Sequence, residues 1–441
     1  MVSWTGEAPQ GFPYWWEAFK NTPDPEDAAP PAKVDLLIIG AGFTGLSAAI
    51  AAHDTGARVA VVDAGNPGCG ASTRNGGMFG AHPRLSHPKL TALFGEETAD
   101  ALFAEAGPAF AFVRDLMQRE EIDCDYQATG RIQLAWTPAH AESQKTLAAS
   151  VRSKSDVRIE TVDETAMRRE IGTERYYGGL LFPDHGAIHP AKFHRGLWTA
   201  ALSRGIPVSA NAPVTALDRD GAGFVATTPR GTIRAAKVVL ATNGYTTRPF
   251  RWHMARVFPL PSFLIATEEL SENLLGQLAP GRRMMVETRA RHSYFRLSPD
   301  GKRILFGGRA AMRDIPLDRA ARRQQATMAE IWPELADVRL SHVWTGYTGY
   351  SFTHMPHVGE EDGLHYALGF SGSGTVMAPY LGAKAAYRAL GDARGKTAYA
   401  ATPLRRHALH VMEKPHFLKA ADLWYRTWVD GWDNLQARRG R

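Results

Sequence analysis

A short glycine-rich turn between two apolar segments most restricts how this chain of 441 residues can fold. An apolar stretch at residues 35–39 leads into the turn at residues 40–45, and a second apolar stretch follows at residues 45–55. The first has the length of a buried strand and the second that of a helix, and a further strand is predicted at residues 58–63. Two strands joined in this way are expected to be parallel, with a right-handed crossover.

The spacing Gly40-x-Gly42-x-x-Gly45 is typical of turns that bind a dinucleotide. The first glycine permits the tight turn, the second lets a pyrophosphate approach the backbone, and the third lets helix and strand pack closely. The helix N-terminus offers N–H donors and partial positive charge to the anion. Asp63 ends the next strand, where its carboxylate can accept from both ribose hydroxyls and disfavours NADP. NAD and FAD both remain possible from the turn alone.

Charge and composition argue against a nucleic-acid partner. The 51 basic residues exceed the 45 acidic ones only slightly, giving a net charge of +6, and no uninterrupted basic stretch contains interleaved aromatic residues. We interpret Arg319, Arg322 and Arg323 as a solvated helix face and residues 438–441 as a frayed chain end.

A few residues bear on disulfides, cellular location, membrane spans and metal sites. Cys69 and Cys124 are the only cysteines, which excludes a disulfide framework and favours a reducing, cytoplasmic location. The apolar run at residues 36–52 is broken by the motif glycines, so we predict strand, turn and helix there and no membrane span. No metal site is expected, because the histidine pairs at residues 185–189 and 354–357 lack a cysteine or carboxylate at ligand spacing.

Other segments favour FAD over NAD. The sequence GCGASTRNGGM at residues 68–78 resembles the G-A-S-x-R-N-G-G stretch of the D-amino-acid-oxidase superfamily, especially its γ-glutamylputrescine oxidoreductase-like branch. Residues 238–245, 344–347 and 369–375 resemble later family segments in the same order. The resemblance spans most of residues 34–390 and implies bound FAD. The aromatic residues Tyr14-Trp15-Trp16-Glu17 also resemble that branch.

Two departures from the superfamily bear on the cofactor. Sarcosine and dimethylglycine dehydrogenases carry a histidine after the second strand that bonds covalently to the flavin, whereas residues 65–80 contain none. The resemblance therefore implies noncovalent FAD. Many members also have glutamate where this chain has Asp63, which shortens the reach to the ribose by one methylene group.

The resemblance and the glycine turn together identify candidate cofactor residues. Val214 would contact the adenine side through its backbone, and Arg74 and Asn75 are the side chains most able to hydrogen-bond the flavin ring. A helix beginning near Gly374 would stabilise negative charge on the reduced ring. The full set is Gly40, Gly42, Phe43, Thr44, Gly45, Asp63, Ala64, Gly70, Ala71, Ser72, Arg74, Asn75, Gly76, Gly77, Met78, Val214, Ala241, Thr242, Gly244, Gly346, Gly372, Ser373, Gly374 and Thr375.

The substrate pocket is harder to identify, because hydride transfer from an amine to flavin N5 needs orientation and a neutral amine more than a dedicated base. The candidates are Tyr294, Arg296, Trp344, His253 and His354. We favour Tyr294 and Arg296, because the Y-x-R strand of the family faces the flavin domain. No catalytic residue is assigned.

The expected reaction is oxidation of a C–N bond in an amine or amino acid, followed by hydrolysis of the imine. Dioxygen or another acceptor would reoxidise the flavin, and a polyamine conjugate such as γ-glutamylputrescine is the substrate we place first. One alternative is a dehydrogenase of an N-alkyl amino acid that passes electrons to a quinone or an electron-transfer protein. Another is a flavin-binding redox sensor or subunit without turnover. The oligomeric state stays open.

The length favours two domains, and the pattern of strands and helices predicts an α/β fold. A Rossmann-type FAD-binding domain would be interleaved with a smaller α+β substrate domain on a mainly antiparallel sheet. The predicted segments are an N-terminal extension (1–32), the FAD domain (33–90, 158–250 and 342–392), the substrate domain (91–157 and 251–341) and a helical tail (393–441). Trp424, Trp428 and Trp432 share one helical face of that tail, which we interpret as a packing stripe.

Overall fold

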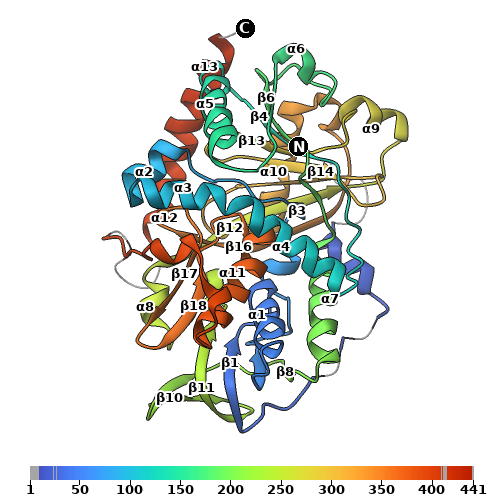
Figure 1. Ribbon diagram of the computed structural model, residues 1–441. Helices are drawn as coiled ribbons and strands as arrows, with labels where there is room; N and C mark the ends of the chain where they lie inside the picture. The colour runs from blue at the N-terminus through green and yellow to red at the C-terminus, as the bar shows by residue number, and fades with distance from the viewer. Residues whose placement is uncertain (1–8, 23, 26, 409, 411–414, 440–441) are drawn as a thin grey trace.

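The structure is a computed structural model that describes residues 9–22, 24–25, 27–408, 410 and 415–439. Its core elements form two eight-stranded sheets. In Figure 1 the first sheet occupies the lower half of the molecule and the second the upper half. This confirms the predicted α/β class with a Rossmann-type part and a second, mainly antiparallel sheet.

The first sheet is built around β1 (Lys33–Ile39), which lies between β2 (Val59–Val62) and β11 (Gly231–Leu240). All three strands are parallel, and α1 (Phe43–His53) connects β1 to β2. The predicted strand, glycine turn, helix and strand are therefore confirmed. The sheet is completed by β8 (Val208–Ser209), β18 (Leu364–Leu368), β17 (His357–Glu361), β10 (Gly223–Thr228) and β9 (Ala216–Asp220).

The second sheet is antiparallel except where β13 pairs with β4. Its strands follow the order β16 (Leu340–Ser351), β12 (Val257–Thr267), β15 (Ile304–Gly308), β14 (Tyr294–Leu297), β13 (Met284–Glu287), β4 (Arg131–Leu134), β6 (Gly179–Phe182) and β5 (Glu160–Val162). A small ribbon of β3 (Met78–Phe79) and β7 (Gly186–Ala187) lies outside both sheets.

Sheet membership differs from the predicted segment boundaries at three strands. β5, β6 and β16 fall in segments assigned to the FAD domain, yet all three pair in the second sheet. The partner of a strand decides its sheet, and strand partners are far apart in this sequence. The division into domains remains a prediction.

Three consecutive helices follow β3: α2 (His87–Phe94), α3 (Glu96–Ala104) and α4 (Ala106–Arg119). Gly95 ends α2 because its φ of +87° is a conformation that glycine adopts without strain. The others are α5 (Pro138–Lys154), α6 (Glu164–Met167), α7 (Pro190–Ser203), α8 (Arg251–Met254), α9 (Glu272–Leu278), α10 (Leu317–Ile331) and α11 (Gly374–Ala389).

No helix in the described part of the chain is long and apolar enough to cross a membrane. The apolar run at residues 36–52 forms β1 and α1, as predicted. Both elements are buried against neighbouring strands and helices.

The C-terminal tail consists of α12 (Phe417–Trp424), a π-helical turn (Tyr425–Val429) and α13 (Asp430–Arg439). The prediction that its tryptophans form a packing stripe is wrong. Trp424, Trp428 and Trp432 are 56%, 66% and 57% exposed. Regular spacing shows that side chains share a face of a helix, but it does not tell which face meets the protein.

Candidate functional site

A central cavity of about 650 Å³ lies where the glycine turn meets the second sheet. One side is formed by the turn after β1, the loop at residues 62–80 and the start of α11. The other side comes from strands of the second sheet, including β4, β12, β14 and β16. Elements far apart in the sequence therefore enclose one space.

The glycines of the turn hold its shape in three different ways. Gly40 has a φ of +109°, and a Cβ there would lie 2.9 Å from the carbonyl oxygen of Ala241. A Cβ on Gly42 would lie 2.8 Å from Ser72 Oγ, and one on Gly45 would lie 1.7 Å from the carbonyl oxygen of Gly40. The structure thus leaves a cradle of bare backbone at the N-terminus of α1, which fits a pyrophosphate.

The Asp63 carboxylate lines the cavity next to this cradle. Its Oδ2 accepts from the N–H of Ala41 at 2.7 Å and its Oδ1 from the N–H of Gly65 at 3.0 Å. Burial raises the pKa of Asp63 despite these hydrogen bonds. Each carboxylate oxygen can accept more than one hydrogen bond, so hydroxyl groups of a ribose can still be received.

The side chains of Arg74 and Asn75 fix the loop that borders the cavity. Arg74 donates from Nε to the carbonyl of Cys69 at 2.7 Å and from Nη1 to the carbonyl of Thr345 at 3.0 Å. Asn75 donates to two carbonyls of its own loop and accepts from the N–H of Gly77 at 2.8 Å. Their polar groups were expected to face a flavin ring, but in this structure they bond to the protein backbone.

Two tryptophans of the N-terminal segment, which do not line the cavity, hold the same loop in place. Trp15 is fully buried and donates from Nε1 to the carbonyl of Asn75 at 2.8 Å. Trp16 donates to Thr73 Oγ1 at 2.9 Å, and its ring lies 4.7 Å from the guanidinium carbon of Arg74. The sequence resemblance included these aromatic residues but indicated no role for them.

Trp15→Phe is expected to lower the free energy of unfolding by about 1–3 kcal/mol, because the carbonyl of Asn75 loses its donor. The loop should loosen, so the purified protein should also retain less FAD. Thermal melting and the ratio of flavin to protein absorbance measure both effects. Trp428→Phe, on the exposed tail, is the matched control and should change neither. Equal behaviour of the two variants would contradict the bracing role.

The starts of two helices meet at this side of the cavity. Gly372, Ser373, Gly374 and Thr375 line it at the N-terminus of α11. α11 packs directly against α1, because a Cβ on Gly382 would lie only 2.2 Å from the carbonyl oxygen of Thr44. Both N-termini direct partial positive charge toward the cavity. This arrangement suits a ligand that carries negative charge at two places, as FAD does when its ring is reduced.

The opposite wall carries three arginines that the sequence reasoning missed. Arg84, Arg131 and Arg309 all line the cavity, and none of them forms an ion pair with a described residue. Arg131 Nε and Nη2 are buried without a hydrogen-bond partner, and burial followed by the charge of Arg84 lowers the pKa of Arg131 to about 9. The alternation of residues 130–135 was a usable signal, since it puts Arg131 on the same face as Gln133.

Tyr350 lies between two of these arginines. Arg84 Nη2 donates to the Tyr350 hydroxyl at 3.1 Å, and Arg309 donates to the same oxygen. Burial alone would raise the pKa of Tyr350, but the guanidinium groups of Arg309 and Arg84 outweigh it and lower the pKa. The wall is therefore strongly cationic.

Nearly all predicted cofactor residues come together in this one place. Each lines the cavity except Gly45, Gly77 and Gly244. Gly45 lies behind the turn and packs against Gly40. The contacts of the individual residues with FAD remain predictions.

A family model described as FAD dependent oxidoreductase (DAO) matches residues 35–388. The chain belongs to this family. The "Probable oxidoreductase OrdL" of Rhizobium meliloti is 32% identical over 364 residues, covering 81% of this chain and 83% of the relative. Gamma-glutamylputrescine oxidoreductase of Escherichia coli is 29% identical over 377 residues, covering 84% and 86%. The crystal structure of glycine oxidase from Geobacillus kaustophilus has a TM-score of 0.68 at 21% identity, covering 86% of this chain and 99% of that one, and supports the fold.

Two of the predicted substrate-pocket residues of this FAD-dependent oxidoreductase line the cavity. The Tyr294 hydroxyl lies 2.9 Å from Ser262 Oγ, and burial raises the pKa of Tyr294 to about 12. His354 lies beside the Tyr350 ring, and burial followed by nearby arginines lowers the pKa of His354 to about 4.

Arg296 and Trp344 do not line the cavity but support the loop beside it. Arg296 donates from Nη1 to the carbonyl of Ile188 at 2.8 Å. Trp344 donates from Nε1 to the carbonyl of Arg74 at 3.0 Å. Both side chains are buried, and both therefore act on the site through the backbone they hold.

His253 lies away from the cavity, packed against Trp252 and Tyr366. Burial lowers its pKa from 6.5 to about 4. Its contribution to stability is therefore complete above pH 6.5 and is lost as the pH falls through about 4. His253→Gln should remove about 3 kcal/mol of the decline in unfolding free energy between these two pH values. Denaturant unfolding across this pH range measures it, and an unchanged decline would contradict the prediction.

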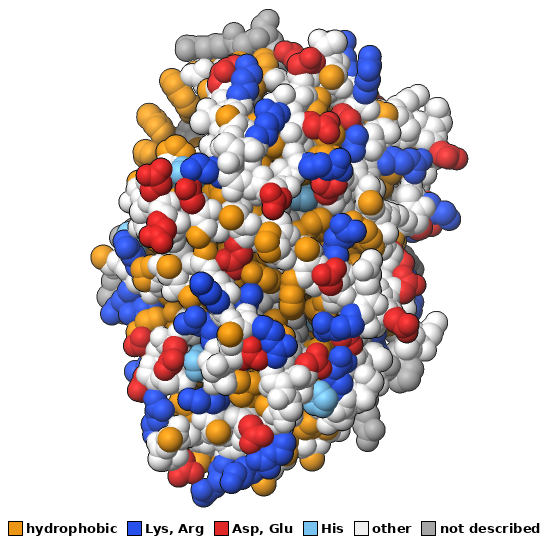
Figure 2. Space-filling model, in the orientation of Figure 1, with side chains coloured by type: hydrophobic (Ala, Val, Ile, Leu, Met, Phe, Trp, Pro, Cys, Tyr) orange, Lys and Arg blue, Asp and Glu red, His pale blue; other side chains and the backbone are white. Residues whose placement is uncertain are grey.

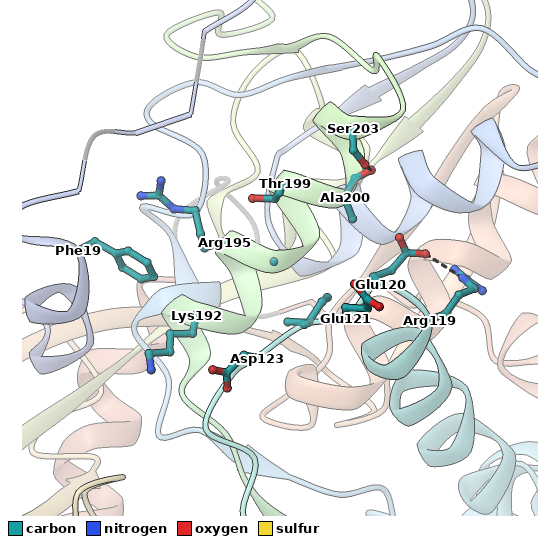
Figure 3. Close-up of a pocket in the computed structure, with 12 residues that line it drawn as sticks. Phe19, Arg119, Glu120, Glu121, Asp123, Lys192, Arg195, Thr199, Ala200 and Ser203 are labelled. Carbon is teal, nitrogen blue, oxygen red and sulfur yellow. Dashed lines mark hydrogen bonds and ion pairs between the residues drawn. The ribbon is translucent and has the colours of Figure 1, made fainter.

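A second hollow on the outer side of α7 is a weaker candidate (Figure 3). The side chains of Lys192 and Arg195 extend from α7, and Glu120 lies opposite at the end of α4. All three are engaged: Lys192 with Asp125 at 2.7 Å, Arg195 with Asp24 at 2.9 Å, and Glu120 with Arg204 at 2.7 Å. Among the described residues, no three His, Cys, Asp or Glu side chains cluster as metal ligands anywhere.

Proposed function

We propose that this FAD-dependent oxidoreductase oxidises a C–N bond in an amine or amino acid that also carries an anionic group. The observation that carries the proposal is the set of three guanidinium groups, Arg84, Arg131 and Arg309, that line the cavity without an ion pair to any described residue. Buried charges are normally paired, and a carboxylate can engage a guanidinium group with two hydrogen bonds. A carboxylate of the substrate would supply the missing partner.

The same charges would prepare the reacting nitrogen. A cationic wall disfavours a second cation nearby, so it lowers the pKa of a substrate ammonium and favours the neutral amine needed for oxidation. His292 and His354 add no charge at neutral pH, since burial lowers their pKa values to about 3 and 4. The Tyr294 hydroxyl, fixed by Ser262, would orient the substrate. When bound, FAD would accept a hydride from the carbon next to the nitrogen, so that the carbon–nitrogen single bond becomes an imine.

The FAD is proposed to be noncovalent, because the loop at residues 65–80 beside the cavity contains no histidine. We also propose a cytoplasmic location. Cys69 and Cys124 are free thiols, which suits a reducing compartment.

γ-Glutamylputrescine is the first substrate to test, because a relative at 29% identity is named for oxidising it. It carries a carboxylate at one end and an oxidisable amine at the other. An N-alkyl amino acid would satisfy the same arginines with a carboxylate next to the nitrogen. The distance between the arginines and the reacting nitrogen of the bound substrate therefore decides between these two substrate classes.

The test is a panel of matched substrates given to the purified holoprotein. Amines with a distant carboxylate, N-alkyl amino acids and the carboxylate-free N-acetylputrescine are compared by formation of carbonyl product. We expect turnover only where a carboxylate is present. Equal turnover of N-acetylputrescine would contradict the assignment. Oxygen uptake against reduction of a quinone analogue then separates an oxidase from a dehydrogenase.

A further inference from the structure

The C-terminal tail presents an apolar face to solvent. We define the C-terminal face as Leu423, Trp424, Trp428, Trp432 and Leu435, which are between 41% and 66% exposed. These are five of the eight large hydrophobic side chains exposed among the described residues. In Figure 2, orange side chains project from the upper left edge of the molecule, where Figure 1 draws the C-terminal helices in red.

Contacts hold the tail against itself and against the rest of the protein. The rings of Trp424 and Trp428 stack with their centroids 5.9 Å apart. The inner side of the tail is held by two residues beside strands of the second sheet. Trp136, after β4, donates from Nε1 to Asn434 Oδ1, and Tyr177, before β6, donates from its hydroxyl to the carbonyl of Ala437. The exposed tryptophans therefore belong to a docked helix.

The acidic side chains of the tail contact the protein, whereas two of its basic side chains are exposed. All three acidic side chains of residues 417–437 point toward the protein: Asp422 accepts from the N–H of Met312, Asp430 pairs with Arg291, and Asp433 lies 4.0 Å from His140. Lys419 and Arg426 are exposed, and neither forms an ion pair with a described residue. Between residues 417 and 437 the exposed side chains are thus apolar or cationic apart from Thr427, and none of the three carboxylates is exposed.

Further basic residues lie near Arg426. Arg323 of α10 lies close enough to Arg426 and Arg319 that, after burial, their charges are the largest influences lowering its pKa. The chain as a whole carries a net charge of +6. Helices that expose both tryptophans and basic side chains are typical of the interface of a membrane, where the amphipathic indole ring sits at the level of the headgroups.

We propose that the C-terminal face docks on the surface of a bilayer that contains anionic phospholipid. The helices would lie in the interface and not span it, in keeping with the absence of a spanning helix among the described residues. A second copy of the chain is a poorer occupant, because it would bring Lys419 and Arg426 of two cationic molecules together. This inference does not depend on the substrate.

The test is sedimentation of the full-length holoprotein with vesicles of phosphatidylcholine that contain phosphatidylglycerol. We expect binding to these vesicles and little to phosphatidylcholine alone, with quenching of tryptophan fluorescence by brominated acyl chains. The triple variant Trp424→Ser, Trp428→Ser, Trp432→Ser should lose both binding and quenching. The double variant Lys419→Gln, Arg426→Gln should weaken binding about thirtyfold, since each basic residue near an anionic surface strengthens binding by a factor of about five.

Matched controls lie elsewhere on the surface. Leu93→Ser removes an exposed leucine of α2, and Lys33→Gln removes an exposed charge at the start of β1, on the opposite side of the molecule in Figure 1. Both should bind vesicles as the wild type does, and melting temperature and flavin absorbance should match in all variants. Wild-type protein that ignores anionic vesicles, or a triple variant that binds them equally, would overturn the proposal. A wild-type dimer that the triple variant dissociates, without vesicle binding, would show that the face joins two copies instead.

Discussion

Gly45→Ala is expected to abolish retention of FAD and to lower the free energy of unfolding by about 3 kcal/mol or more, at or above the upper end for overpacked cores. The added Cβ would lie 1.7 Å from the carbonyl oxygen of Gly40, and a backbone oxygen in a tight turn cannot move aside. α1 would have to shift away from β1. It is also held against α11 through the close contact of Thr44 with Gly382, so the strain would reach both helix N-termini at the cavity.

The ratio of flavin to protein absorbance after purification and the thermal melting curve measure this effect. Gly276→Ala in α9 is the matched control, because a Cβ there meets no atom within 4 Å. It should bind FAD normally and gain about 1 kcal/mol of stability from the better helix propensity of alanine. A Gly45→Ala protein that keeps its flavin and melts like the wild type would contradict the proposed cradle.

Arg131→Met should reduce kcat/KM for a carboxylate-bearing substrate by about a hundredfold, which corresponds to the roughly 3 kcal/mol upper range for a hydrogen bond to a charged group. Methionine keeps much of the side-chain volume but removes the charge that now lies buried without a partner. Stability should stay constant or rise, because an uncompensated charge is removed from the interior. Loss of activity with unchanged or increased stability separates a substrate-binding role from a structural one.

The control for this variant is Arg168→Met, which removes an exposed guanidinium group paired with Glu174 at 2.9 Å, away from the cavity. Its kcat/KM should equal that of the wild type. Any slow oxidation of N-acetylputrescine should also be unaffected by Arg131→Met. A parallel loss with both kinds of substrate would show that Arg131 shapes the site without recognising a carboxylate.

The cofactor side of the cavity could be predicted from the sequence because its requirements are local. Gly40, Gly42 and Gly45 each meet a steric demand set by neighbours within one turn or by the adjoining strand and loop, and their spacing alone expresses it. The cationic wall could not be predicted in this way. Arg84 and Arg309 converge on Tyr350 from segments more than two hundred residues apart, and the lack of a carboxylate beside them is a property of the folded chain.

The sheet to which a strand belongs, and the exposure of the tail tryptophans, could not be predicted for a related reason. Residues 342–351, placed in the FAD segment, lie in β16 and pair with β12 of the second sheet. The spacing of Trp424 and Trp428 correctly placed these two on one face, since their rings stack. Whether that face is buried depends on the inward pairing of Asp422 and Asp430, which periodicity does not encode.

Anaerobic mixing of the purified protein with γ-glutamylputrescine, followed by visible absorbance, tests the central claim most directly. The protein should be yellow, release its FAD on denaturation as noncovalent cofactor, and bleach when the substrate is added. Bleaching should be lost or greatly slowed in Arg131→Met while the flavin stays bound. Protein that cannot be reconstituted with FAD, or bound flavin that no carboxylate-bearing amine or amino acid reduces, would contradict the account.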